Sequence, residues 1–305
     1  MRRAFVEALV DLAAGDERVF LLTADLGWNA LEPFEEAFPE RFLNVGVAEQ
    51  NLAGLATGLA LLGFIPFIYS IATFASMRCY EQIRNGALLH GLPVRIIGIG
   101  GAYAYGHAGP THYALEDLAI FRTQPGMTVL IPADPEQTRA CILATQALTG
   151  PAYLRIGKGG NNVVPGLGGR FRYGEVELIR DGLQVLLVVC GAIACEAVRA
   201  SQLLEREGFG AAVAVMAHLP FQAGPSTVGL LKNFRVVATI EEAYVVGGLG
   251  SFVAETIAQN DLECRLIRIG VDTALDCDAG TEGYMRSRKK LNAESIAKEL
   301  LDLSI

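Results

Sequence analysis

The sequence predicts an α/β protein with two successive domains, each built on a mainly parallel β-sheet. Short apolar segments alternate with helical patterns along the chain, which is typical of parallel strands covered by helices. The composition agrees, since 51% of the residues are hydrophobic and 19% are charged. The 305 residues are enough for two cores, and a stretch rich in glycine and asparagine at residues 158–169 is the best candidate for a linker between them.

The first half alternates regularly between helices and strands. Apolar residues at helical spacing indicate the helices, and short apolar runs between turn residues indicate the strands. The expected helices are residues 3–14, 32–38, 48–62, 74–89, 115–122 and 135–148. The expected strands are residues 19–22, 42–44, 65–69, 94–99, 127–131 and 152–156, with a glycine-rich loop at residues 100–110.

A second α/β series follows the glycine-rich stretch. Its expected strands are residues 185–190, 211–216, 236–240 and 265–269. Its expected helices are residues 192–206, a helix opened by the glycines of residues 247–250, and residues 293–303. We therefore place the first domain at residues 1–160, the linker at 161–174 and the second domain at 175–305.

Charge and cysteine usage exclude several classes of protein. The net charge is −8 and there is no long basic run, which argues against nucleic acid or an anionic membrane as a partner. Residues 52–77 carry no charged side chain, but Gly63 and Pro66 interrupt them, so a helix and a buried strand explain the run better than a membrane span. The six scattered cysteines match neither a zinc site nor a disulfide framework, so we expect a cytoplasmic protein without a metal site of its own.

Glu49 is the most informative single residue. It lies at the start of an expected helix that otherwise carries no charge. Burial of a carboxylate is costly unless the group is protonated or hydrogen-bonded. Glu49 is therefore either an exposed acid favoured at a helix N-terminus or a carboxylate held in a cavity for a chemical purpose.

Four motifs of the first half follow one another in a fixed order: Asn44-Val-Gly-Val-Ala-Glu49-Gln50, Tyr69-x-x-x-Thr73-Phe74 with Tyr80, Gly109-Pro-Thr-His112 and Pro132-Ala-Asp134. In their order and spacing they resemble the pyrimidine-binding domain of transketolases. Downstream, Gly191 after a strand, Glu241-Glu242 and Gly247-Gly248-Leu249-Gly250-Ser251 resemble the C-terminal domain of the same family. The resemblance covers nearly the whole chain and implies a thiamine diphosphate pyrimidine-binding domain followed by a transketolase C-terminal-like domain.

The resemblance also implies a partner subunit. Full-length transketolases hold the diphosphate of thiamine diphosphate and its metal through a Gly-Asp-Gly motif and a downstream asparagine, and no Gly-Asp-Gly occurs here. The chain is thus similar to the small subunit of a split transketolase, which transfers a two-carbon ketol unit from a ketose to an aldehyde. The implied partner is an N-terminal subunit that holds the diphosphate and Mg²⁺ or Ca²⁺, in a heterotetramer of two large and two small subunits.

The resemblance assigns roles to the residues around the cofactor. Glu49 would hydrogen-bond N1′ of the aminopyrimidine ring and so activate the cofactor. Phe74 would stack on that ring, with Tyr80 in the same pocket and Asp25 close to the site. His112 would handle protons of the substrate hydroxyls. In the alternative readings, Phe74 and Tyr80 are core aromatic residues and Asp25 caps a turn or helix.

At the positions that contact substrate, the sequence departs from phosphosugar transketolases. Arg155 matches the family arginine that meets the sugar phosphate, although a salt bridge is its alternative role. Those enzymes carry a histidine where this chain has Gly100, a serine at Asn29 and acidic residues at His107 and Ala108. The cofactor chemistry therefore resembles the family while substrate recognition differs, which indicates ketol transfer on an unusual sugar.

Two other functions remain open at this point. One is a thiamine diphosphate enzyme with a 2-oxoacid donor, similar to deoxyxylulose phosphate synthase or to the beta subunit of a 2-oxoacid dehydrogenase, because those enzymes use a glutamate in the same way. The other is a catalytically silent scaffold subunit, because this chain lacks the metal-binding motif.

Overall fold

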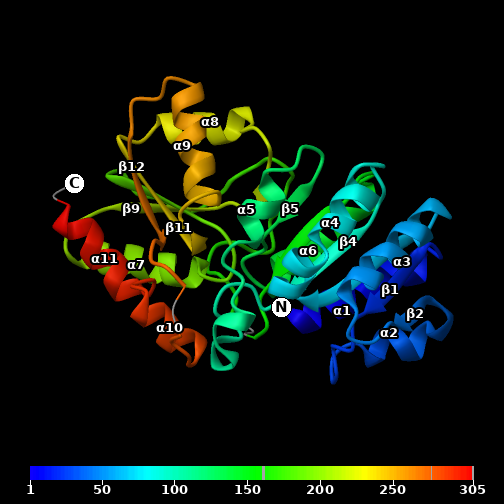
Figure 1. Ribbon diagram of the computed structural model, residues 1–305. Helices are drawn as coiled ribbons and strands as arrows, with labels where there is room; N and C mark the ends of the chain where they lie inside the picture. Colours follow the sequence, from blue (N-terminus) through cyan, green and yellow to red (C-terminus); the bar gives the residue numbers. More distant parts are fainter. Residues whose placement is uncertain (160–161, 276, 304–305) are drawn as a thin grey trace.

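The computed structural model describes residues 1–159, 162–275 and 277–303, and it has the predicted fold of two α/β units (Figure 1). Residues 160 and 161, where we placed the end of the first domain and the start of the linker, lie outside the described residues. The end that carries α2 and α3 and the end that carries α11 lie on opposite sides of the molecule (Figure 1).

The first unit is built on a 7-stranded sheet with the strand order β10-β5-β6-β4-β3-β1-β2. Its strands are β1 (Val19–Thr23), β2 (Phe42–Asn44), β3 (Ile65–Ile71), β4 (Arg95–Ile99), β5 (Thr128–Leu130), β6 (Ala152–Ile156) and β10 (His218–Leu219). Its helices are α1 (Arg2–Gly15), α2 (Glu32–Ala37), α3 (Glu49–Leu61), α4 (Tyr80–Ile83), α5 (Asp117–Arg122) and α6 (Pro135–Ala144). Short 3₁₀ segments are η1 (Pro39–Arg41), η4 (Gly106–Ala108), η5 (Pro110–His112) and η6 (Thr145–Ala147).

The second unit is built on a 5-stranded sheet with the order β12-β11-β8-β9-β7. Its strands are β7 (Glu177–Arg180), β8 (Val185–Val189), β9 (Ala211–Val215), β11 (Val236–Tyr244) and β12 (Arg265–Val271). Its helices are α7 (Ala194–Arg206), α8 (Pro225–Lys232), α9 (Leu249–Gln259), α10 (Glu282–Arg288) and α11 (Ala293–Asp302). Only β7 pairs antiparallel among the strands that the structure describes in this sheet.

Apolar side chains cover both faces of the first sheet, as expected for parallel strands. On one face, Phe5 and Leu9 of α1 pack with Ile142 of α6 in one buried cluster. On the other face, Leu52 and Ala56 of α3 belong to a second buried cluster. The uncharged stretch of residues 52–77 is thus a helix and a buried strand, as predicted. Among the described residues, no helix combines the length and apolar character that crossing a bilayer requires.

Some predicted elements are wrong in extent. Residues 74–89 do not form one regular helix, because two π-helical segments, η2 (Phe74–Arg78) and η3 (Arg84–Leu88), flank the short α4. β11 continues past its predicted end, so Glu241 and Glu242 lie inside the strand rather than after it. The sequence prediction missed β7, β10, α8 and α10, which are short and carry weak periodicity.

β10 links the two units, since it comes from the second half of the chain but pairs antiparallel with β5 of the first sheet. Its first residue, His218, accepts a hydrogen bond at Nδ1 from the backbone N–H of Gly174, with an N···N distance of 2.9 Å. The ring of Tyr173 lies edge-on to it, 5.5 Å away between centroids. Burial lowers the pKa of His218 to about 4, so the imidazole stays neutral at this junction.

Stability should therefore depend on pH through His218. The unfolded chain binds a proton at this residue below its ordinary pKa of about 6.5, whereas the folded chain does so only near pH 4. The folded state thus binds fewer protons between these values, and its stability falls as the pH falls. Between pH 7 and pH 5, the free energy of unfolding should fall by about 2 kcal/mol less in His218→Asn than in the wild type. This variant keeps a hydrogen-bond acceptor at the position.

Denaturant unfolding of the wild type and the variant at both pH values measures this effect. His90→Asn is the matched control, because His90 is exposed. An identical pH dependence for wild type and His218→Asn would contradict the assignment.

Candidate active site

The candidate residues gather at one edge of the first sheet. Asp25 and Asn29 follow β1, Glu49 follows β2, and Phe74 follows β3. Gly100 and the loop with His107 and His112 follow β4. β1, β2, β3 and β4 run parallel, so their carboxyl ends meet at the same edge, where open α/β sheets place their ligands.

Glu49 is the first residue of α3, and it is buried, with 5% of its surface exposed. Its carboxylate forms an ion pair with the guanidinium of Arg78, with a distance of 3.0 Å between Oε1 and Nη1. This pairing satisfies the requirement that a buried carboxylate have a partner. Of the two alternatives for Glu49, the structure therefore shows the carboxylate held inside the fold rather than at an exposed helix end.

Phe74 contacts the same arginine as Glu49. The guanidinium carbon of Arg78 is 3.7 Å from the centroid of the Phe74 ring, which is a close cation–π contact. The ring also meets His112 edge-on at 5.1 Å between centroids. The structure thus brings together three of the predicted site residues, Glu49, Phe74 and His112, with Arg78 between the first two.

The loop after β4 extends this cluster. His112 ends η5, and its ring lies 6.3 Å from that of Tyr105. The Nζ atom of Lys158, which follows β6, is 4.1 Å from the centroid of the Tyr105 ring. Gly100 has φ +70°, a conformation that disfavours other residues, and a Cβ there would collide with the Tyr105 ring. Tyr105 thus fills the space that a side chain at position 100 would need.

A hollow of about 580 Å³ opens beside the carboxylate. It is lined by the entry to α3 and by one residue of η2, namely Val47, Ala48, Glu49, Gln50, Asn51 and Arg78. A small planar group could reach Glu49 from this side. In the part of the chain that the structure describes, no three His, Cys, Asp or Glu side chains are grouped so that they could hold a metal ion.

Asp25 and Tyr80 are held by contacts outside this cluster. The backbone N–H of Asp25 donates to Oδ1 of Asn44 (3.0 Å), and Nδ2 of Asn44 donates back to Oδ1 of Asp25 (3.3 Å), which ties the ends of β1 and β2. The hydroxyl of Tyr80 donates to the carbonyl of Ile120 (3.3 Å) and accepts from Gln124 (2.5 Å). The predicted contact of these two residues with the cofactor therefore stays a prediction.

Asn29 and His107 are exposed at the same edge of the sheet. Asn29 has φ 58°, and its backbone N–H donates to Oε1 of Glu32 at 2.7 Å. His107 lies within η4, in the loop after β4. Both positions are accessible to a substrate, but neither touches Glu49 or Phe74 in the contacts of the described residues.

Arg155 lies in β6 and is directed toward the interior. It is 7% exposed, and its Nε lies 3.3 Å from Oδ2 of Asp117, which is fully buried. The guanidinium also donates to the backbone carbonyls of Ala114 and, at 2.8 Å, of Glu242 in the second unit. Burial raises the pKa of Asp117, against the influence of Arg155 and of the Tyr153 hydroxyl. Arg155 thus forms a buried ion pair in this structure, in keeping with the salt bridge that was the alternative to a phosphate contact.

The acidic pair of β11 has structural partners. Glu242 is bound at both carboxylate oxygens by Arg286, at 2.7 Å each. Glu241 accepts from the backbone N–H groups of Leu249 and Gly250 (2.8 and 2.7 Å), which begin α9, while burial raises its pKa to about 7. These two acids therefore hold the second unit together and cap a helix.

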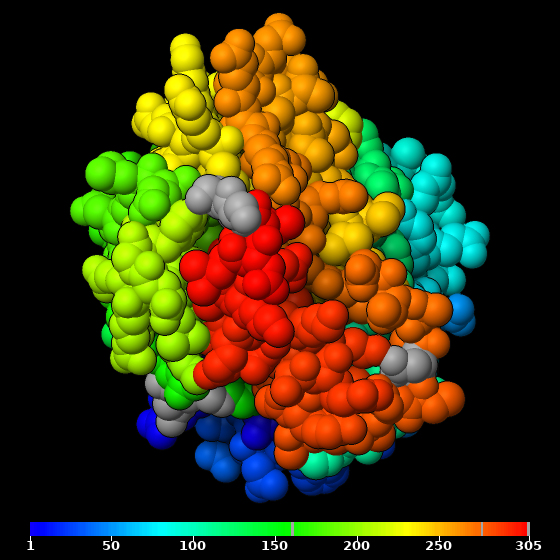
Figure 2. All heavy atoms as spheres, turned by 90° about the vertical axis from the view of Figure 1, so that its left-hand side faces the viewer, coloured from blue at the N-terminus to red at the C-terminus, as the bar shows by residue number. Residues whose placement is uncertain are grey.

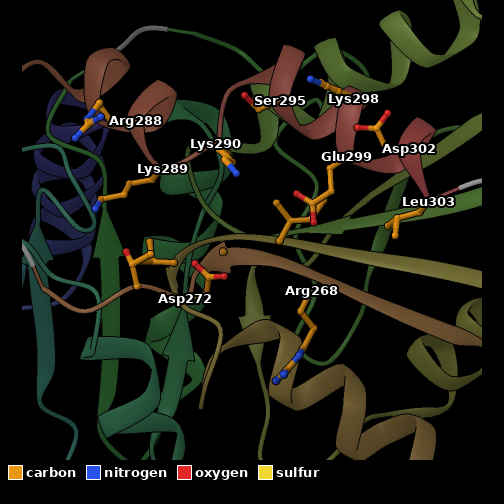
Figure 3. A pocket seen from close by; sticks show the side chains of 14 residues that line it. Arg268, Asp272, Arg288, Lys289, Lys290, Ser295, Lys298, Glu299, Asp302 and Leu303 are labelled. Carbon is orange, nitrogen blue, oxygen red and sulfur yellow. The ribbon is translucent and has the colours of Figure 1, made fainter.

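A larger hollow lies in the second unit, between the end of β12, the turn after α10, and α11 (Figure 3). Figure 2 shows the face of the molecule on which α11 (red) lies at the centre. The hollow measures about 670 Å³. Its charged side chains are of both signs, five basic (Arg268, Arg288, Lys289, Lys290 and Lys298) and three acidic (Asp272, Glu299 and Asp302), so the lining is mixed in charge. The sheet edge that carries Glu49 is therefore the better candidate for the active site.

Sequence reasoning missed Arg78, Tyr105 and Lys158. Arg78 carried one signal, since it is the first charged side chain after the uncharged residues 52–77. Tyr105 and Lys158 lie in glycine-rich segments whose course the sequence does not determine.

Two family models match the chain. The model described as "Transketolase, pyrimidine binding domain" matches residues 1–162, and the one described as "Transketolase, C-terminal domain" matches residues 174–282. Together they cover the first unit and the second unit as far as the start of α10.

Individual proteins are similar over almost the full chain. A protein of Clostridium sp. named 6-deoxy-6-sulfo-D-fructose transketolase subunit SqwH is 34% identical, over 98% of this chain and 92% of that protein. A 1-deoxy-D-xylulose-5-phosphate synthase of Thermomicrobium roseum is 32% identical over 97% of this chain, which spans only 47% of that longer protein. A solved structure described as a split gene transketolase, inactive beta4 tetramer, superposes with a TM-score of 0.88 at 35% identity, covering 99% of this chain and 97% of that chain.

Proposed function

This chain belongs to the transketolase family, of which it carries the pyrimidine-binding and C-terminal domains, and from that premise we propose that it is the small subunit of a split transketolase. With its partner it transfers a two-carbon ketol unit from a ketose donor to an aldehyde acceptor. The cofactor is thiamine diphosphate. The observation that carries the proposal is the buried Glu49 carboxylate beside the face of Phe74, at the carboxyl edge of a parallel sheet.

These residues fit the aminopyrimidine half of the cofactor. Such a ring is flat, with hydrogen-bonding nitrogens at its edge, so it needs an aromatic face and a buried acid, and Phe74 and Glu49 supply both. The cofactor supplies the electron sink, whereas the protein supplies orientation and electrostatics. Glu49 holds the proton shared with N1′, and His112, against the edge of Phe74, exchanges protons with substrate oxygens. Asp25 and Tyr80 complete the proposed surroundings of the cofactor.

The diphosphate and its Mg²⁺ or Ca²⁺ belong, in this proposal, to a partner subunit with a diphosphate-binding domain. The exposed face of α3 supports such a contact. Leu55, Leu61 and Leu62 are exposed, and a Cβ added at Gly54 or Gly58 would meet no atom within 4 Å. An apolar face with small residues allows another chain to approach closely. A heterotetramer of two large and two small subunits, in the cytoplasm, completes the proposed assembly.

We also propose the division into residues 1–160, 161–174 and 175–305, which the two matched ranges support.

The substrate is proposed to be an unusual sugar. The loop after β4 supports this, because Tyr105 occupies the space next to Gly100 where phosphosugar transketolases carry a histidine. Asn29 and His107 remain proposed substrate contacts because they are exposed at the same edge. The similar Clostridium protein is named for a sulfonated ketose rather than a phosphorylated one. Arg155 remains a proposed phosphate contact, although its present partners compete with that role.

Reconstitution tests the function. The chain is co-expressed with a partner that carries Gly-Asp-Gly and a downstream asparagine, and phosphorylated, sulfonated and unsubstituted ketoses are screened as donors with a common aldehyde acceptor. We expect ketol transfer that requires both chains and added thiamine diphosphate, with a different donor preferred over xylulose 5-phosphate.

Two results would contradict the proposal in different ways. Release of CO₂ from pyruvate would assign the chain to the enzymes with 2-oxoacid donors. An absence of thiamine-dependent turnover with every donor, in a mixture that forms a stable complex, would indicate a scaffold subunit.

A further inference from the structure

The guanidinium of Arg78 lies against the two side chains that the proposed function assigns to the pyrimidine ring. Its Nη1 is 3.0 Å from Oε1 of Glu49, and its central carbon is 3.7 Å from the centroid of Phe74. A guanidinium is planar and carries its N–H donors at the edge. Arg78 thus presents a flat face to the aromatic ring and a hydrogen-bonding edge to the carboxylate.

An aminopyrimidine has the same two features, a flat face and hydrogen-bonding groups at its edge. Because one guanidinium touches both groups, the face of Phe74 that it covers is the one on the side of Glu49. A pyrimidine ring that reaches both groups would therefore use that face and that carboxylate. Only one planar group can stack on a given ring face at van der Waals distance. Arg78 and the pyrimidine ring therefore exclude each other from these contacts.

The geometry points to Arg78 as an internal substitute for the pyrimidine: it holds Glu49 and Phe74 while the site is empty and must leave when the cofactor enters. This inference rests on the proposed function. It also explains how a carboxylate only 5% exposed is tolerated without cofactor, since a buried charge without a partner is costly.

Arg78 is able to leave. Its side chain is 47% exposed, whereas that of Glu49 is 6% exposed. Within the part of the chain that the structure describes, the guanidinium has polar or ring contacts only with Glu49 and Phe74. Arg78 is the last residue of η2, and π-helical segments are often found at functional sites. Half-exposed ion pairs and cation–π contacts are weak, so a ligand can displace this one.

The test is a calorimetric titration of thiamine diphosphate into the complex of this chain with its partner, in the absence of substrate. Arg78→Met keeps the aliphatic length and removes the guanidinium. We expect this variant to bind thiamine diphosphate about 5- to 10-fold more tightly than the wild type. This is the change in affinity that corresponds to the free energy of one half-exposed ion pair and one cation–π contact. Arg78→Lys, which keeps the charge and loses the planar group, should lie between the two.

Arg206→Met is the matched control, since Arg206 is exposed at the end of α7, and its affinity should equal that of the wild type. If the wild type binds and Arg78→Met and Arg78→Lys bind equally or more weakly, the inference fails while the proposed function stands, because Arg78 would then support the cofactor. If the wild-type complex binds no thiamine diphosphate at all, the proposed function fails and the inference falls with it.

Discussion

Replacement of Arg155 by methionine is expected to lower the free energy of unfolding by about 3–5 kcal/mol at neutral pH, as is typical when one partner of a buried ion pair is removed. The substitution leaves Asp117 fully buried without its cationic partner, while the Tyr153 hydroxyl still donates to its Oδ2 at 2.5 Å. It also removes the donors to the carbonyls of Ala114 and Glu242, and the second of these contacts joins the two units.

The loss should shrink in acid, because burial raises the pKa of Asp117 and the neutral acid needs no cation. Denaturant unfolding at two pH values measures both effects. The double variant with Arg155→Met and Asp117→Asn removes the charge together with its partner, so it should recover part of the lost stability. A midpoint for Arg155→Met equal to that of the wild type would contradict the structural role.

The same variant addresses the phosphate contact expected for Arg155. A structural role predicts a loss of stability whatever the substrate. A contact with the sugar phosphate predicts instead a higher KM for phosphorylated donors at unchanged stability. The two roles therefore give different results on one protein.

The parallel architecture could be predicted from the sequence because buried parallel strands are short continuous apolar runs. β3, β4 and β8 are buried along their whole length, and each was found within two residues of its ends. β10 could not be found in this way. It has only two residues, and its pairing with β5 depends on how the two units pack.

A carboxylate at the start of an uncharged helix left two possibilities for Glu49, an exposed acid or a buried one, and the structure shows the buried one. The sequence did not predict its partner, because Arg78 lies 29 residues further along the chain, in residues 74–78, which form a π-helical segment rather than the expected regular helix. Local propensity does not distinguish these two forms over five residues. The ordered motifs indicated the cofactor. They could not predict the contacts of Arg155, because those contacts depend on how the second unit packs against the first.

Replacement of Glu49 by glutamine in the reconstituted enzyme is expected to reduce turnover by about 100-fold or more, the usual weight of one general acid–base group. Glutamine has the same shape as glutamate, so it preserves the packing of α3. It cannot share a proton with N1′ of the pyrimidine as a carboxyl group does. Glu207→Gln, at an exposed position that follows α7, is the matched control and should keep wild-type turnover.

We propose that Glu49 activates a cofactor whose other half is held by a partner chain. The most direct test is the turnover number of the Glu49→Gln enzyme, measured with the partner subunit and with thiamine diphosphate at concentrations that saturate each variant. We predict a loss of at least about 100-fold while the complex remains assembled. Turnover within a few-fold of the wild type under the same conditions would contradict it.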